Sequence, residues 1–546
     1  MIDRITTSKI STKRAGQNNQ KSFKGADTAI LGGLRALNNS PAVGACAVDL
    51  CSMVIPRTAV EAKNRGVQSG IETAFREGGS CLIHACVGLI GFGAAALLSG
   101  GFNKKYSVKA QNIFASGDTI NNMSALWQKS EGQSKQFFDN FLQNIEGLDG
   151  TGWKRVSAGA KDEIVENLVS LADKTKQAAA AKGADKSKLT KEAKELKSLV
   201  VSKLTKDTGA AASFKLNATQ GAKEISSSLS DLVDNAVVIS NSLQGRAEES
   251  VPSFVKALTK NKRNSTLLGL GICAALCMSV QPLNRYLTKK RTGKDGFVGV
   301  ESEKNDKSKG FKAAKTVAGV AFPAFAISTI GSLENFISNV QFNSKVPTIN
   351  QFKLLYGLTI GSRFMSARDG NELREACIKD TLGFTNWLIL GGMVSKLTAR
   401  VLGGKDLINN PIAQEGGKKG IKYAAKWLTK ASVKSFDEVL LPNAKEITKD
   451  GKMMKFSELY KNADSSVKSK VLKIAGSQVA GYLYSGLVLG VGIAKLNIFI
   501  TKRINAKRKA AENMNEKIAE IGGKKLDLDY MAKMQSQLSS VFKDFS

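Results

Sequence analysis

A histidine and an aspartate inside apolar stretches are the residues of this chain most able to do chemistry. His84 is the only histidine and lies in the apolar segment 81–98, and Asp49 lies in a weaker apolar segment, 41–55. Ionisable side chains inside a membrane segment are candidates for ion or proton paths, so the two could form a polar intramembrane pair. A hydrogen-bonded packing pair is the favoured interpretation, because such paths usually use several ionisable groups.

Charged residues recur at matching positions in two stretches, 56–81 and 362–383. Each stretch opens with an arginine and later carries a glutamate, three other residues and a basic–acidic pair. The charges are Arg57, Glu72, Arg76 and Glu77 in the first stretch and Arg363, Glu375, Lys379 and Asp380 in the second. An alignment of both ends needs a three-residue gap, so chance is the alternative to a true repeat. A true repeat predicts two similar re-entrant or hairpin units, with charges that form ion pairs at the membrane surface.

The sequence contains no recognisable catalytic, metal or cofactor motif. It lacks the GxxxxGK[ST] loop, the GxSxG elbow and the HExxH helix, so we do not expect an enzyme. The seven cysteines form no CxxC pair, and a single histidine cannot build a zinc site alone. We interpret the cysteines as small packing residues and expect neither a bound metal nor a cofactor.

Apolar segments instead dominate the pattern. Five stand out, at residues 81–98, 266–280, 316–333, 382–394 and 474–494, and 41–55 and 352–361 are weaker. A helical span needs about 20 mostly apolar residues, and we expect the second segment to end at Pro282. The chain is therefore predicted to be all-α, a polytopic helical bundle in the cell membrane with five to seven spans and polar helical insertions.

Small residues at a spacing of four predict close helix packing in the last span. Gly486, Gly490 and Ala494 share one face there, and such faces let helix backbones approach in lipid. We expect Gly490→Leu to weaken the bundle, whereas Gly117→Leu, in a polar region, should not.

Changes in composition along the chain predict seven parts. They are a disordered basic arm (1–40), a first hairpin and span (41–104), a polar helical domain (105–263), a membrane core with the second repeat (264–395), a Lys-rich helical region (396–473), the last span (474–494) and an amphipathic polybasic tail (495–546). Within the polar domain, apolar residues over 225–243 keep a coiled-coil spacing, although a helical hairpin or small bundle explains it equally well.

The charge balance indicates acidic partners. Lysine and arginine number 80 against 47 acidic residues, a net charge of +33, which suits a bilayer with anionic headgroups. Self-association or other membrane proteins are further partners, and nucleic acid is not expected because the basic runs lack interleaved aromatic residues. The short basic connector, residues 283–315, predicts a cytoplasmic location for itself and, if the weak segment 352–361 crosses the membrane, for both repeats and for the tail. Residues 105–263 and 396–473 should then lie on the opposite side. If that segment does not cross, the tail lies outside.

The two repeat stretches also carry a resemblance. PRTAVE and ETAFRE in the first, and NQFKLLYGLTIGSRFMSAR with ELREACIKDTLGFTNWLILG in the second, resemble uncharacterised bacterial multi-pass helical membrane proteins with no assigned activity. The resemblance covers the surroundings of residues 41–100 and 265–395 and implies a membrane location only. We expect a structural or interaction scaffold at the membrane; the alternatives are a transporter or channel, and a secreted translocator or pore former.

Overall fold

The protein is helical, as predicted, with three very small sheets. The computed structural model describes residues 20–39, 41–147, 152–211, 214–219, 223–300, 305–342, 346–390, 392–412, 420–522 and 536. The sheets are β1–β2–β3 (Ile145–Gly147, Phe214–Leu216, Ile225–Ser227), β4–β5 (Ile408–Asn409, Ser432–Val433) and β6–β7 (Thr448–Lys449, Lys452–Met453), all antiparallel. Strands of two or three residues carry too little alternation to be predicted.

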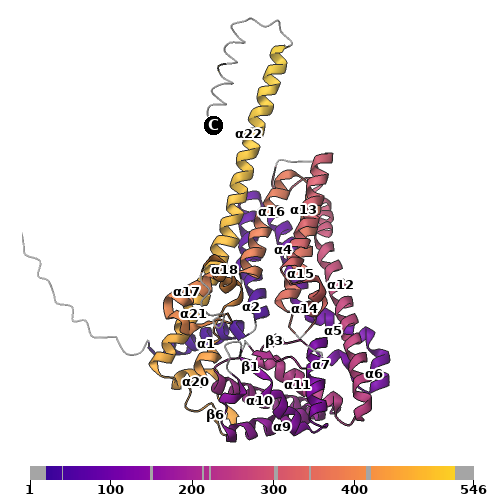
Figure 1. Cartoon of the computed structure of the whole chain (residues 1–546). Coiled ribbons are helices and arrows are strands. Elements are labelled where there is room, and N and C mark those ends of the chain that lie inside the picture. The colour runs from indigo at the N-terminus through magenta and orange to yellow at the C-terminus, as the bar shows by residue number, and fades with distance from the viewer. Residues whose placement is uncertain are drawn as a thin grey trace, which may run out of the picture.

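An upright bundle of helices forms the upper part of the molecule in Figure 1. Its elements are α2 (Pro41–Ala47), η1 (Val48–Val54), α3 (Ile55–Arg65), α4 (Val67–Ala85), α5 (Val87–Leu98), α12 (Val251–Thr292), α13 (Lys309–Ser328), η5 (Leu333–Asn335), α14 (Phe336–Val340), α15 (Ile349–Met365), α16 (Gly370–Phe384), η6 (Thr385–Ile389), η8 (Ser485–Gly492) and α22 (Ile493–Gly522). Helix α6 (Gly100–Tyr106) follows α5 at the lower end of the molecule in Figure 1. The connector lies at the upper end, and α22 extends beyond it.

Two polar lobes lie together at the other end of the bundle, which we call the basal end. The first lobe comprises η2 (Ala110–Asn112), α7 (Gly117–Lys129), α8 (Ser134–Gln143), β1, η3 (Trp153–Arg155), α9 (Ala158–Ala180), α10 (Gly183–Thr208), β2, β3, α11 (Leu229–Leu243) and η4 (Glu248–Ser250). The second comprises α1 (Gln20–Asn39), α17 (Met393–Gly403), η7 (Gly404–Leu407), β4, α18 (Ile421–Lys430), β5, α19 (Phe436–Leu440), β6, β7, α20 (Phe456–Asn462) and α21 (Ser465–Tyr484).

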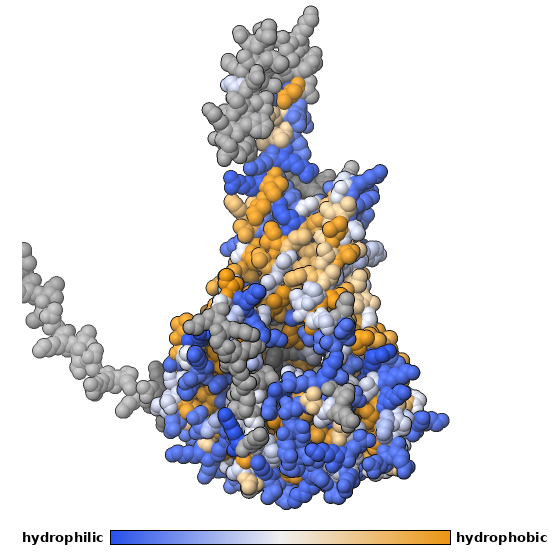
Figure 2. All heavy atoms as spheres, viewed as in Figure 1, coloured by the Kyte–Doolittle hydropathy of each residue, from blue (hydrophilic) through white to orange (hydrophobic). Residues whose placement is uncertain are grey.

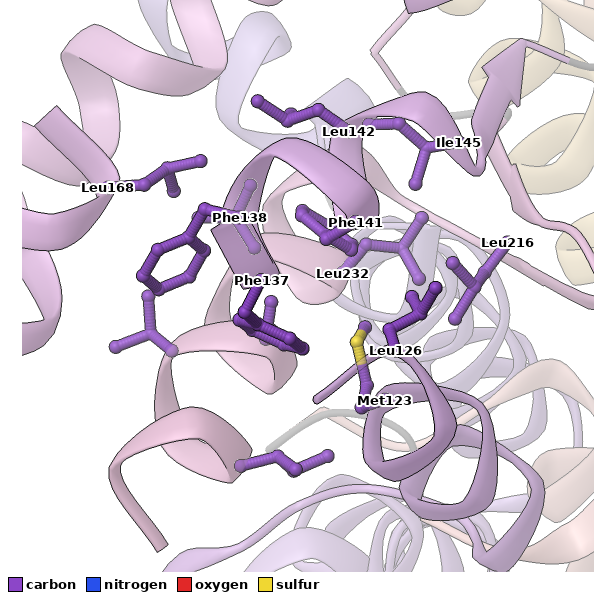
Figure 3. Close-up of a cluster of buried hydrophobic side chains, with 14 of the residues drawn as sticks. Met123, Leu126, Phe137, Phe138, Phe141, Leu142, Ile145, Leu168, Leu216 and Leu232 are labelled. Carbon is purple, nitrogen blue, oxygen red and sulfur yellow. The ribbon is translucent and has the colours of Figure 1, made fainter. Parts of the chain in front are cut away.

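The first lobe has its own hydrophobic core. Figure 3 shows three phenylalanines of α8, Phe137, Phe138 and Phe141, packed among side chains of α7, α9 and α11. The apolar run over 225–243 contributes to this core from β3 and from the buried face of α11, so it serves a small globular lobe. Residues 183–208 form the single helix α10, which packs along α9.

Helix α4 exposes apolar side chains and buries charged ones. The exposed side chains, which recur at helical spacing, are Val67, Ile71, Phe75 and Leu82. On the other face Glu72, Glu77 and His84 are at most 4% exposed. A helix at the surface of a water-soluble protein has the opposite pattern. Figure 2 shows that apolar surface covers the bundle between the hydrophilic basal end and the hydrophilic side chains at its upper end.

Three helical runs among the described residues are long and apolar enough to cross a bilayer. They are Val43–Arg65, Glu248–Thr292 and Ser465–Ile518, and α4 with α5, bent by 52°, could form a fourth. The expected span 316–333 lies mainly in α13 and is not one of these runs. The prediction of a single span over 382–394 is wrong, because the helix breaks before Gly392, whose φ of 70° begins a new helix, α17.

Several expected boundaries fall inside continuous helices. Helix α12 crosses the boundary at 263, and the run Ser465–Ile518 crosses those at 473 and 494, so the polybasic stretch continues the last span as α22. The arm prediction is wrong for residues 20–39, which form α1, because its apolar face packs on the second lobe. Residues 1–19, 40, 523–535 and 537–546 lie outside the described residues.

Helix α12 also continues through Pro282, so the expected end there is wrong. Proline has no amide proton to donate to the carbonyl of Met278, one turn earlier. The hydroxyl of Ser362 on α15 donates a hydrogen bond to this carbonyl instead, at 2.7 Å. A neighbouring helix thus satisfies the freed backbone group, which is how apolar bundles tolerate internal prolines.

Candidate functional site: a buried ionic cluster between two hairpins

The two repeat stretches form two helical hairpins that face each other. Hairpin A consists of α3 and α4, and hairpin B of α15 and α16. Both loops meet the connector: Arg291 donates to Gln68 beside the loop of hairpin A, and the amide of Asp306 donates to the carbonyl of Arg368 in the loop of hairpin B. The two hairpins therefore point in the same direction, as in parallel repeats related by an axis along the bundle.

Charged residues at equivalent positions of the two repeats form equivalent ion pairs within each hairpin. Arg57 approaches Glu77 at 3.4 Å in hairpin A, and Arg363 donates to Asp380 at 3.0 Å in hairpin B. Glu77 is also the centre of the cluster, because Lys379 donates to it at 2.5 Å and Arg363 lies 3.4 Å away. These side chains are at most 9% exposed, so the expected ion pairs form in the interior of the bundle and not at a membrane surface.

Two further ion pairs connect the hairpins reciprocally. Arg65 of hairpin A donates two hydrogen bonds to Glu375 of hairpin B, at 2.6 and 2.9 Å. Arg368 of hairpin B in turn donates to Glu72 of hairpin A. Each arginine also pairs within its own hairpin, Arg65 with Glu61 at 3.3 Å and Arg368 with Glu372 at 2.9 Å. This exchange of partners across the interface is what two equivalent hairpins would produce.

We call these twelve side chains the ionic cluster. Its members are Arg57, Glu61, Arg65, Glu72, Arg76 and Glu77 from hairpin A and Arg363, Arg368, Glu372, Glu375, Lys379 and Asp380 from hairpin B. Each hairpin supplies three positive and three negative groups. Four members, Glu61, Arg65, Arg368 and Glu372, were missed by sequence reasoning. Opposite charges four residues apart on a helix were a usable signal for Glu61 and Arg65, whereas Arg368 lies in the loop before α16.

Phe297 of the connector covers the cluster at its upper end. The guanidinium groups of Arg65 and Arg368 lie 5.1 and 5.5 Å from the centre of its ring, within the range of a cation–π contact. Its side chain is buried, with 7% exposed. Nothing in the local sequence marked this phenylalanine, because both arginines that it contacts are distant from it along the chain.

Asp49 and His84 are close to one side chain but have no direct hydrogen bond in the described part of the chain. Tyr356 of α15 donates its hydroxyl to Asp49, and its ring lies 3.9 Å from that of His84, centre to centre. The Nε2 atom of His84 lies 3.3 Å from the hydroxyl of Thr359. All four residues are buried. Tyr356 therefore joins the two predicted residues into one group. This group lies further from the connector than the ionic cluster does.

The predicted small-residue face is present only in part. Gly490 lies against η1 and α3, where a Cβ atom would meet the carbonyl oxygen of Ser52 and lie 3.0 Å from Cβ of Pro56. Ala494 is buried beside Val60. A Cβ atom added at Gly486 would have no neighbour within 4 Å among the described residues, so the assignment of Gly486 to the packing face is wrong. The π-helical turn of η8 changes the side-chain spacing from that of an α-helix, which explains the difference.

The arrangement offers ion pairing and polar solvation in the interior of the bundle. Among the described residues, no three histidine, cysteine, aspartate or glutamate side chains are placed to hold a metal ion. The seven cysteines are unpaired, and Cys81, Cys273 and Cys277 are buried in the packing of the bundle.

Comparison with models of protein families, with curated protein sequences and with solved structures finds no match to this chain. The geometry of the described residues is therefore the basis on which a function can be assigned.

Proposed function

We propose that the protein is a multi-pass integral membrane protein that acts as a scaffold, holding its two basal lobes at one surface of a membrane. The observation that carries this proposal is the inverted pattern of α4, which faces outward with Val67, Ile71, Phe75 and Leu82 and inward with charges. Lipid favours such a helix, because ionisable groups in a bilayer face the bundle interior and pair with one another.

The helices that connect the bundle to the lobes support the scaffold proposal. Helix α12 begins in the first lobe, where Phe254 and Leu258 are buried in its core, and continues as a bundle helix to Thr292. The run Ser465–Ile518 connects the second lobe to the bundle in the same way. Continuous helices transmit orientation better than loops, so the lobes would be held in a fixed position for self-association or for other membrane proteins.

The topology expected from the basic connector agrees with this arrangement. Both hairpin loops meet the connector, whereas α9, α10 and α20 lie at the basal end. If the connector is cytoplasmic, as its charge predicts, both lobes face away from the cytoplasm. Reporter fusions after residues 180 and 430 should then give signals opposite to those after residues 300 and 370. A shared signal at 180 and 300 would contradict the proposal.

Extraction of membranes at alkaline pH tests the proposal most directly. The protein should remain in the membrane pellet after washes with high salt and with alkaline carbonate, because apolar contacts are insensitive to both. Recovery in the soluble fraction without detergent would overturn it and would favour a protein that is exported before it inserts.

A transporter or channel is the second candidate, and the ionic cluster favours it. Two equivalent hairpins with ionisable groups between them are a common construction for membrane transport sites. The twelve charged groups and the polar group around Tyr356 form the chain of ionisable residues that a single His–Asp pair lacks.

A further inference from the structure

The ionic cluster encloses a small cavity between the hairpins. Its volume is about 20 Å³, and its walls include Arg57, Glu72 and Lys379 of the cluster, Phe297 of the connector and Asn497 of α22. A cavity of this size accommodates about one water molecule. The two hairpins are therefore in close contact, with a polar space at the centre of their interface.

Three of the basic side chains that cross the interface are also paired within their own hairpin. The arginines that reach across the interface are Arg65, Arg363 and Arg368, and each also contacts a carboxylate of its own hairpin. Separation would leave all three paired. Lys379 differs, because its ion pair with Glu77 crosses the interface and would be lost on separation, and a buried charge that loses its partner is destabilising.

Separation at the connector end would create a site with charges of both signs. Glu375 and Glu72 would lose the arginines of the opposite hairpin, while Arg65 and Arg368 would each keep one carboxylate and have hydrogen-bond donors free. The groups that lose partners there are two carboxylates, Glu72 and Glu375, and two arginines, Arg65 and Arg368, so a simple cation or a simple anion would match only one kind of them. A solute with a positive and a negative group would be complementary to both walls.

We propose that hairpins A and B form the two walls of a site for a small zwitterionic solute, entered from the connector end and closed there by Phe297. The proposal rests on the second candidate function, a transporter or channel. Phe297 is suited to closure because one ring contacts an arginine of each hairpin, so it must move before they separate. Its position on the connector, outside both hairpins, lets it move without breaking a hairpin.

Swelling of proteoliposomes tests the proposal with glycine as the probe. The full-length protein is reconstituted, the vesicles are shrunk in excess glycine, and the rate at which they swell again reports glycine entry. Phe297→Ala should increase this rate several-fold over the unchanged protein. Phe325→Ala is the matched control, because Phe325 lies on α13 with 42% of its surface exposed and should leave the rate unchanged.

The outcomes separate the site from the membrane proposal. Equal glycine rates in all three proteins would overturn the site, and an equal increase for glycine and potassium chloride would overturn its selectivity for zwitterions. Adding Glu375→Gln to Phe297→Ala should lower the glycine rate again, since one charged wall group is lost. Flotation of the protein with the vesicles is measured first, because failure to float would refute membrane integration and not the site.

Discussion

Gly490 is the position where one added side chain should disturb the bundle most directly. A Cβ atom there would meet the backbone oxygen of Ser52 and the ring of Pro56, and neither can move aside by a change of rotamer. Overpacking of this kind costs about 1–3 kcal/mol. Gly486 lies one helical turn away, and a Cβ atom added there would have no neighbour within 4 Å among the described residues, so a leucine there should meet far less steric hindrance.

Comparison of the two leucine variants separates the effect of packing on stability from the effect of helix propensity. Replacement of glycine by leucine favours a helix by about 0.8 kcal/mol at either position, so this gain cancels in the comparison. Gly490→Leu should therefore be less stable than Gly486→Leu by about 1–3 kcal/mol. If the bundle unfolds as one unit, its thermal midpoint should be lower by about 2–12 °C.

Thermal unfolding of the two variants in detergent measures this difference. Equal midpoints would refute the close approach of η8 to η1 and α3. Gly117→Leu, the control suggested by the sequence, is unsuitable: Gly117 is buried, its amide donates to Gln341, and a Cβ atom would lie 2.8 Å from Thr259. The position belongs to the contact between the first lobe and the bundle and not to an open polar surface.

Three further predictions concern buried polar contacts. Ser362→Ala should destabilise the detergent-solubilised protein by about 1 kcal/mol, because the carbonyl of Met278 loses its donor; an unchanged midpoint would show that another group replaces the hydroxyl. Arg65→Glu and Glu375→Arg should each lower stability by about 3–5 kcal/mol, and the double variant should recover part of the loss if the two side chains pair as described. Burial lowers the pKa of Lys396 from its ordinary 10.5 to about 8, so between these values the unfolded chain holds a proton that the native chain has lost. Lys396 should then contribute a rise in the free energy of unfolding with pH of up to about 1.4 kcal/mol per unit, and Lys396→Met should reduce the slope of unfolding curves measured from pH 8 to 10.5 by this contribution.

Local patterns in the sequence predicted the helices and located the hairpins. Apolar periodicity identifies helices without knowledge of their neighbours, and the repeat charges Arg57 and Arg363 were found because each precedes a helix with a matching glutamate and charge pair. A local pattern was misleading at α12, where the proline was expected to end the helix. The helix continues because a side chain of α15 donates the hydrogen bond that the proline cannot. The helix α1 was missed because its apolar face becomes evident only against the second lobe.

The candidate site was predicted only in part, because its contacts join segments that are distant along the chain. The equivalence of Glu72 and Glu375 was visible, but their exchange of arginine partners depends on the register of two hairpins about 300 residues apart in the chain. Arg65 and Arg368 fall where the two repeats differ in length, so the alignment did not match them. The group around Tyr356 was anticipated through Asp49 and His84, whereas the tyrosine that joins them had no distinguishing neighbours in the sequence.

The division of charge between the hairpins also bears on how the bundle forms. Each hairpin holds three positive and three negative groups of the cluster, and the pairs Arg57–Glu77 and Arg363–Asp380 close within one hairpin. A separate hairpin would therefore keep most of its own charges paired, whereas Glu72 and Lys379 find their ion partners only when the two hairpins pack together. The pairs Arg65–Glu375 and Glu72–Arg368 then fix the register. A slip of one helical turn would break both at once, so the cluster selects a single alignment of the two hairpins.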